Sequence, residues 1–174
     1  MAVSSICRRA GALLALLAVV VIGGAGTASA QPAGSALAGA YFKVVNQNSG
    51  KCLDVRREDP KPLAGVQQYR CTGTDNQLWT AVSTGDGYSY LVSKESGLCM
   101  QPFLFTVTVV NTCSGATGQQ WRAVPAGFEW NELRSRLLDQ QCLWVVSSSV
   151  ADSVATRLAA CDGSAAQHWQ FVTV

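Results

Sequence analysis

Cysteine is the most reactive side-chain type in this sequence, and six of the seven cysteines recur in a regular order. The first cysteines of three successive units are Cys52, Cys99 and Cys142. The second cysteines, six to eight residues before a Gln-x-Trp triplet, are Cys71, Cys113 and Cys161. The triplets are Gln77-Leu78-Trp79, Gln119-Gln120-Trp121 and Gln167-His168-Trp169. Because tryptophan is scarce and glutamine is seldom buried, this threefold match indicates an internal repeat.

The chemistry expected of these cysteines is disulfide formation. An even number of cysteines in a secreted chain favours bridges over a metal site. Six cysteines allow many pairings, and the repeat selects one bridge inside each unit. Each bridge is expected to stabilise the fold by about 3 kcal/mol, because it restricts the unfolded chain. The predicted bridges are Cys52–Cys71, Cys99–Cys113 and Cys142–Cys161.

Catalytic chemistry finds little support in the residue types. The single histidine, His168, is the variable residue of a Gln-x-Trp triplet and a poor candidate for a general base. The sequence has no Gly-x-Ser-x-Gly motif, no histidine pair at metal-ligand spacing and no phosphate-binding loop. A glycosidase needs two carboxylates about 5 to 10 Å apart, for which the candidates are Asp54 and Asp75. We therefore expect no enzymatic activity, no metal and no cofactor.

Residues 1–30 have the pattern of a signal peptide. Arg8 and Arg9 form a basic start, an apolar segment follows, and Ala28-Ser29-Ala30 fits a cleavage site. Residues 31–40 are small, polar or flexible and are expected to be a linker. The sequence therefore predicts a secreted, extracellular protein whose folded domain spans residues 41–174.

The charge balance of the secreted part limits its partners. Removing residues 1–30 takes away Arg8 and Arg9 and leaves 11 basic and 11 acidic residues, so the net charge is zero. Nucleic acids and anionic membranes are bound through clustered lysine and arginine. We therefore expect no nucleic-acid partner and no membrane insertion.

The elements that must position these residues are β-strands. The segment 42–46 is extended, the turn Asn48-Ser49-Gly50 follows, and the segment 51–55 resumes the pattern. The segments 90–93 and 98–100 copy this arrangement, and 133–136 and 141–143 follow it less closely. No window has a sustained helical period, so we expect an all-β domain. One unit has too little core to fold alone, whereas three bury their tryptophans together. The repeats are predicted to span about 41–87, 88–129 and 130–174.

Three features together point to a known family. They are the three Gln-x-Trp triplets, the three internal cysteine pairs and the segment Cys52-Leu53-Asp54-Val55. On these features the chain resembles a ricin B-chain type lectin over the whole of residues 41–174. The resemblance implies a β-trefoil with pseudo-threefold symmetry, in which six strands form a barrel capped by three hairpins. It also implies a monomer that binds a carbohydrate, of galactose type or a related glycan. Repeat-period tryptophans normally serve the shared core, so Trp79, Trp121 and Trp169 are expected to be structural.

The resemblance places a sugar pocket in the first repeat. Its residues there are Asp54, Gln67, Tyr69, Asn76 and Gln77. A carboxylate accepts hydrogen bonds from sugar hydroxyls, an asparagine donates and accepts, and a tyrosine ring offers a flat apolar face to the C–H side of a pyranose. The alternative is that Asp54 and Asn76 are only turn residues, since both types are common in turns.

The other two repeats depart from this pattern at each corresponding position. The second repeat has Gln101, Val109, Asn111 and Gly118, and the third has Trp144, Arg157, Ala159 and Ala166. Neither set presents a carboxylate opposite an aromatic ring, so one working pocket is expected. Trp144 is either a new stacking surface or a packing residue, and we favour packing.

The second repeat also carries an apolar stretch, Phe103 to Val110. Alternate side chains of this stretch are expected to enter the barrel. Its other face supports a rival hypothesis, in which the trefoil binds a protein as an inhibitor or assembly component. Competition by a simple sugar would distinguish the two hypotheses.

Overall fold

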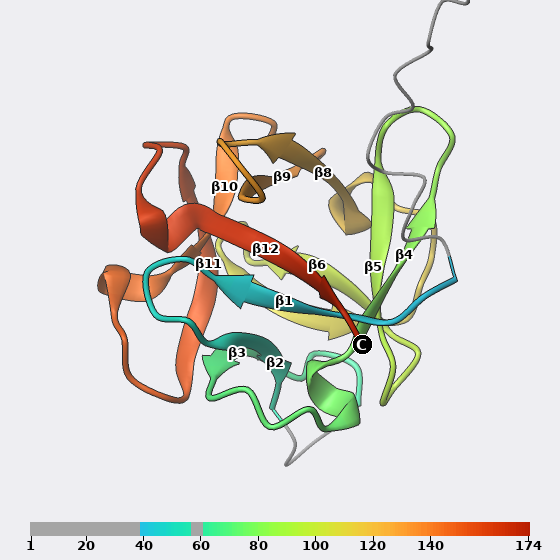
Figure 1. The fold of residues 1–174 in the computed structure, drawn as a ribbon. Helices are drawn as coiled ribbons and strands as arrows, with labels where there is room; N and C mark the ends of the chain where they lie inside the picture. Colours follow the sequence, from blue (N-terminus) through green and yellow to red (C-terminus); the bar gives the residue numbers. More distant parts are fainter. Residues whose placement is uncertain (1–38, 57–60) are drawn as a thin grey trace, which may run out of the picture. The chain divides into compact units, whose positions relative to one another are not determined.

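The computed structural model describes residues 39–56 and 61–174 (Figure 1). The predicted signal peptide, residues 1–30, and nearly all of the predicted linker, residues 31–40, lie outside the described residues. Over the two described ranges, no helix is long and apolar enough to cross a membrane.

Six strands of the described chain close into a barrel. They are β1 (Phe42–Asn46), β4 (Trp79–Ser83), β5 (Ser89–Ser93), β8 (Gln120–Pro125), β9 (Asn131–Ser135) and β12 (His168–Thr173). Each strand pairs antiparallel with the next, and β12 pairs with β1 to complete the ring. Figure 1 shows β1 in blue beside β12 in red, so the first and last strands form one seam. Closure pairs every barrel strand on both sides, which removes exposed sheet edges.

The other six described strands form three hairpins. These are β2 (Cys52–Val55) with β3 (Val66–Tyr69), β6 (Cys99–Phe103) with β7 (Val107–Asn111), and β10 (Gln141–Val145) with β11 (Val154–Ala160). The hairpins contact one another, because β11 pairs with both β3 and β7. Each repeat thus contributes two barrel strands and one hairpin, and the fold is the predicted all-β trefoil.

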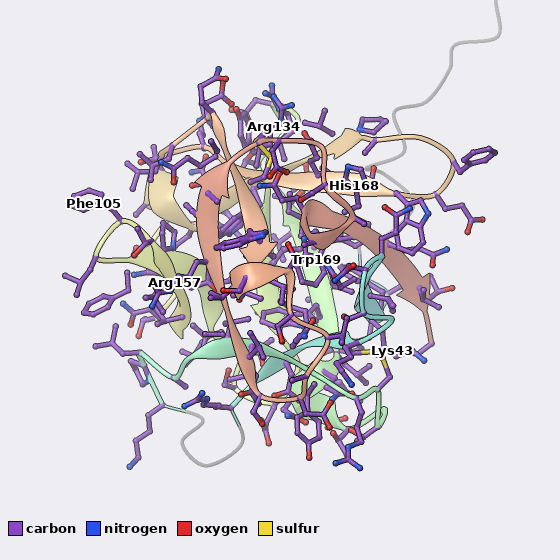
Figure 2. All side chains as sticks on the ribbon, turned by 90° about the vertical axis from the view of Figure 1, so that its left-hand side faces the viewer. Lys43, Phe105, Arg134, Arg157, His168 and Trp169 are labelled. Atoms are coloured by element: carbon purple, nitrogen blue, oxygen red, sulfur yellow. A yellow bond between two sulfur atoms is a disulfide. The ribbon has the colours of Figure 1, made fainter. Side chains whose placement is uncertain are left out.

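A short 3-10 turn precedes the last strand of each repeat, and it carries the glutamine of the Gln-x-Trp triplet. The turns are η2 (Asp75–Gln77), η3 (Thr117–Gln119) and η5 (Ala165–Gln167), and one further turn, η4 (Val146–Ser148), follows β10. The triplet tryptophan then enters the barrel core, where it is almost completely buried. Figure 2 shows Trp169 inside the ribbon.

The three tryptophans are hydrogen-bonded in the same way. Each Nε1 donates to the backbone carbonyl that follows the first cysteine of its repeat. The pairs are Trp79 to Leu53 at 3.0 Å, Trp121 to Met100 at 2.9 Å and Trp169 to Leu143 at 3.0 Å. A buried indole N–H needs such a partner, so each tryptophan both fills the core and fixes one hairpin. All three side chains lie in the barrel core.

The three disulfides join the predicted pairs, Cys52–Cys71, Cys99–Cys113 and Cys142–Cys161. The triplet glutamine of each repeat holds the backbone on both sides of the second cysteine. Gln77 accepts from Thr72 N at 2.8 Å and donates to Arg70 O at 2.9 Å. Gln119 and Gln167 make the matching pairs around Cys113 and Cys161. A buried glutamine is satisfied in this way, which explains an otherwise unusual core residue.

The apolar stretch of the second repeat differs from its expected alternation. Three consecutive side chains, Thr108, Val109 and Val110, are buried, because β7 packs against neighbouring hairpins as well as the barrel. The tip of the β6–β7 hairpin faces solvent instead, with Leu104 75% and Phe105 70% exposed. Figure 2 shows Phe105 at the outer edge of the ribbon.

Candidate functional site

A pocket of about 650 Å³ lies in the first repeat, against the β2–β3 hairpin. Four of its lining residues were predicted from the sequence: Asp54, Gln67, Tyr69 and Asn76. Four others were not predicted: Arg56, Thr72, Thr74 and Ser153. The lining is therefore rich in hydroxyl, amide and charged groups, with one aromatic ring.

The register of the hairpin brings two of these residues together. Asp54 on β2 lies directly opposite Gln67 on β3, and Cys52 lies opposite Tyr69. Residues two apart on a strand share a face, so Gln67 and Tyr69 are presented on the same side. The disulfide from Cys52 to Cys71 ties the end of this hairpin to the loop that carries Thr72 and Thr74.

Asp54 is a buried carboxylate that accepts hydrogen bonds from three side-chain amides of the site. It is only 3% exposed and accepts from Gln67 Nε2 at 2.8 Å, Asn76 Nδ2 at 2.8 Å and Gln77 Nε2 at 2.9 Å. Amide N–H donors compensate the burial of a carboxylate and fix its orientation. A sugar hydroxyl that donates to Asp54 would share the carboxylate with these amides.

Gln77 lies behind the pocket rather than on its wall. Its side chain is fully buried, and it divides its hydrogen bonds between Asp54 and the backbone around Cys71. In this arrangement Gln77 positions Asp54 and has no surface to offer a ligand. The family resemblance groups Gln77 with the lining residues, because its position in the sequence does not reveal how deeply the side chain is buried.

Asn76 links the carboxylate to two threonines. Its Nδ2 also donates to Val55 O at 3.0 Å, and its Oδ1 accepts from Thr74 Oγ1 at 2.6 Å. The Thr74 hydroxyl lies 2.7 Å from that of Thr72, which gives a continuous polar chain along the wall. Thr72 and Thr74 flank the predicted motif, but no sequence feature marked them as lining residues.

The third repeat supplies one wall of this pocket. Ser153 N donates to Gln68 O at 3.0 Å, and Gln68 Nε2 donates to Ser149 O and Ala151 O, both at 2.8 Å. These bonds dock the loop 149–153 onto β3. Ser153 is separated from the first-repeat motif by much of the chain, and only the fold brings it to the site.

An ion pair beside Ser153 connects this loop to the aromatic wall. Asp152 pairs with Lys51 at 2.7 Å and accepts from Arg70 N at 3.0 Å and Arg70 Nε at 2.9 Å. The hydrogen bond from Lys51 holds the pKa of Asp152 below its usual value, with a further contribution from Arg70. The Arg70 guanidinium lies 5.3 Å from the ring centre of Tyr69. Tyr69 is half-buried, so its ring is both supported and partly accessible.

The corresponding positions of the other repeats lack this arrangement. In the second repeat, Gln101 accepts from Gln119 Nε2 at 2.9 Å, which reproduces the Asp54–Gln77 contact without a charge. In the third repeat, Trp144 lies opposite the exposed Arg157. Figure 2 places Arg157 on the surface near the β11 ribbon.

Residues considered for catalysis or metal binding lie elsewhere. Asp75 is exposed and pairs with Lys94 at 2.9 Å, and it is not among the residues that line the pocket. His168 Nδ1 lies 2.7 Å from Gln47 Oε1 on the barrel surface. Within the described ranges, the one grouping of possible metal ligands is Glu132 with Cys142 and Cys161, whose sulfurs form a disulfide. These positions do not combine into a reaction centre.

Comparison with known proteins identifies the class to which this fold and site correspond. The family described as ricin-type beta-trefoil lectin domain-like matches residues 32–102. ThreeFoil, a designed protein with threefold symmetry, is 32% identical, has a TM-score of 0.74, and the match covers 77% of this chain and 99% of that chain. The chain therefore belongs to the ricin-type β-trefoil lectin family.

Two further solved structures are similar. The exo-β-1,3-galactanase 1,3Gal43A from Clostridium thermocellum is 28% identical, with a TM-score of 0.74, and the match covers 78% of this chain but 30% of that chain. The Macrolepiota procera ricin B-like lectin, solved in complex with lactose, is 20% identical, with a TM-score of 0.66 and coverage of 78% and 96%. At 20% identity, the likeness to the Macrolepiota procera lectin shows the fold alone.

Proposed function

We propose that the protein is a secreted, monomeric lectin that binds a carbohydrate reversibly through one pocket, in the first repeat. The observation that carries this proposal is the Asp54 carboxylate, fixed by three side-chain amides in a pocket that also contains the Tyr69 ring. Sugars are recognised by fixed acceptors for their hydroxyls and by flat apolar surfaces for their C–H faces. The pocket offers both.

Other features support the remaining parts of the proposal. Three disulfides fit a protein that acts in an oxidising compartment, as the predicted signal peptide implies. The zero net charge of residues 31–174 argues against nucleic acid as the partner. The 28% identical galactanase supports a galactose-type or related glycan as the ligand. No catalytic role is proposed.

Titration calorimetry with galactose and lactose tests the site. Hydrogen bonds to a charged acceptor contribute about 1.5 to 3 kcal/mol each, so Asp54→Ala should weaken binding at least about tenfold. Tyr69→Ala should act similarly because it deletes the stacking face, whereas Tyr69→Phe should be tolerated because the ring remains.

Gln101→Ala and Trp144→Ala are the matched controls at the Asp54 position of the other repeats. Both should retain the wild-type affinity, with folding of every variant checked by circular dichroism. Retained affinity in folded Asp54→Ala, or lost affinity in folded Trp144→Ala, would move the site away from the first repeat.

The exposed hairpin tip favours a second candidate, a trefoil that binds a protein. Phe103, Leu104 and Phe105 are consecutive apolar residues in solvent, and clustered exposed apolar side chains often mark interaction sites. A protein partner that is not displaced by any sugar, and that is lost in Phe103→Ser and Phe105→Ser, would favour this candidate.

A further inference from the structure

Arg56 is a lining residue of the pocket that the lectin proposal leaves without a role. It lies directly after β2, two residues beyond Asp54, and its side chain is exposed. Among the described residues that line the pocket it is the sole cation, and Asp54 is the sole anion.

The guanidinium of Arg56 is anchored at one point. Its Nε donates to Gln67 Oε1 at 3.0 Å, and Gln67 Nε2 in turn donates to Asp54 Oδ1 at 2.8 Å. The two terminal amino groups of Arg56 have no hydrogen-bond or ion-pair partner among the residues that the structure describes. A guanidinium held at Nε presents these two groups as a preformed fork, which suits a planar carboxylate.

The two charges of the pocket are not equivalent toward a ligand. Asp54 is almost completely buried, and three amide donors surround its oxygens. Arg56 is exposed, and the remaining lining groups are neutral hydroxyls, amides and a phenol. Among the described lining groups, the charge that faces solvent is therefore positive.

We infer that the pocket selects an acidic sugar, a hexuronate whose ring is held at Asp54 and Tyr69 and whose carboxylate is bound by the terminal amino groups of Arg56. This inference rests on the proposed lectin function and specifies its ligand. The sugar hydroxyls donate to Asp54, while the ligand carboxylate accepts from Arg56.

Matched sugar pairs test the inference by calorimetry on the wild-type domain. Methyl galacturonide is compared with methyl galactoside, and methyl glucuronide with methyl glucoside, because each pair differs only at C6. The uronide of at least one pair should bind about fivefold tighter, a modest gain because exposed charge pairs are screened by solvent. The preference should fall as ionic strength rises from about 0.01 M to about 1 M, where the Debye length shortens from about 30 Å to about 3 Å.

The ratio of the two affinities within each variant is the readout, since it is insensitive to a general weakening of the pocket. Arg56→Gln should bring the ratio to about one, and Arg56→Lys should leave an intermediate value because the charge remains but the fork is lost. Arg157→Gln removes an exposed arginine from the corresponding hairpin of the third repeat and should leave the ratio unchanged.

Three results would overturn the inference. Equal affinity for both members of each pair in the wild type, or an unchanged ratio in Arg56→Gln, would overturn it while leaving the lectin function intact, provided that Asp54→Ala abolishes binding of the neutral sugar. Binding of none of the four sugars to the folded domain would overturn both proposals.

Discussion

The Nε2 atom of Gln77 donates to the Asp54 carboxylate at 2.9 Å and also to Arg70 O at 2.9 Å. One buried amide thus connects the central acceptor of the pocket to the backbone beside the Cys52–Cys71 disulfide. Gln119 makes the same two contacts in the second repeat, but its side-chain partner there is the neutral Gln101. The triplet glutamine makes the same kind of contact in both repeats, but its side-chain acceptor is charged only in the first repeat.

The first prediction separates the positioning role of Gln77 from its structural role. Gln77→Ala removes four hydrogen bonds and should lower the free energy of unfolding by about 1 to 3 kcal/mol. It should also weaken sugar binding at least about tenfold. Gln119→Ala should lose similar stability but retain the wild-type affinity. Chemical denaturation and calorimetry on both variants provide the measurements.

Two results would contradict this positioning role. Undiminished sugar affinity in folded Gln77→Ala would show that Asp54 keeps its geometry without this amide. Equal affinity losses in Gln77→Ala and Gln119→Ala would show that the effect is general loosening of the trefoil.

The second prediction concerns the disulfides. Replacing Cys99 and Cys113 by alanine should lower stability by about 3 kcal/mol without changing affinity, because that loop does not contribute to the pocket. Replacing Cys52 and Cys71 should cost similar stability and also weaken binding, because this bridge ties the Thr72 and Thr74 wall to β2. Equal affinity in the two double variants, measured well below their melting temperatures, would contradict the prediction.

The third prediction concerns Asp152 and pH. The pKa of Asp152 is lowered in the fold, chiefly by the Lys51 hydrogen bond, so its unfolded-state pKa of about 3.9 lies above the folded value. The stabilisation is therefore complete above about pH 4 and is lost as pH falls through the folded pKa. The difference in melting temperature between the wild type and Asp152→Asn should be present at pH 7 and shrink as the pH falls below about 4.

Asp152→Asn should also weaken sugar binding at neutral pH by up to about fivefold, a modest loss because solvent-accessible charge pairs are weak. Loss of this carboxylate loosens both Arg70, which lies over Tyr69, and the loop that carries Ser153. Asp139→Asn, which removes another surface ion pair away from the pocket, is the control and should leave affinity unchanged. A melting-temperature difference that persists unchanged at pH 3 would contradict the assignment.

The fourth prediction concerns strain at the β6–β7 tip. Leu104 and Phe105 both have positive φ values, 48° and 63°, in a two-residue turn closed by Thr106 N to Phe103 O. Asn-Gly is the favoured sequence for such a turn, and a left-handed conformation costs an ordinary residue about 1 to 2 kcal/mol. The double variant Leu104→Asn, Phe105→Gly should therefore raise the melting temperature by a few degrees.

This variant also tests the protein-binding alternative, because it removes two exposed apolar side chains without lowering stability. If the tip binds a protein, the variant should lose that partner in a pull-down while its melting temperature rises. A lower melting temperature would show that Leu104 and Phe105 pack against the domain.

Several features of this protein follow from the sequence by itself. The three repeats and the disulfide pairs were predicted correctly, because a period in residue types is visible without coordinates. Each repeat must bury the same apolar side chains and bond the same cysteines, so one set of local contacts recurs three times. Asp54, Gln67, Tyr69 and Asn76 were grouped by the resemblance to ricin B-chain type lectins, and the structure places them around one pocket.

Only the tertiary structure decided the depth of each residue and the contacts between repeats. Gln77 has the spacing of a pocket residue but lies behind Asp54, because the 3-10 turn directs it into the core. Arg56 joins the lining because it follows Asp54 at the strand period of two, although its role depends on Gln67 across the hairpin. Ser153 reaches the pocket, and Asp152 lies next to it in the chain, because β11 packs against β3 when the trefoil closes. Such contacts depend on how distant segments dock, and no local pattern in the sequence encodes them.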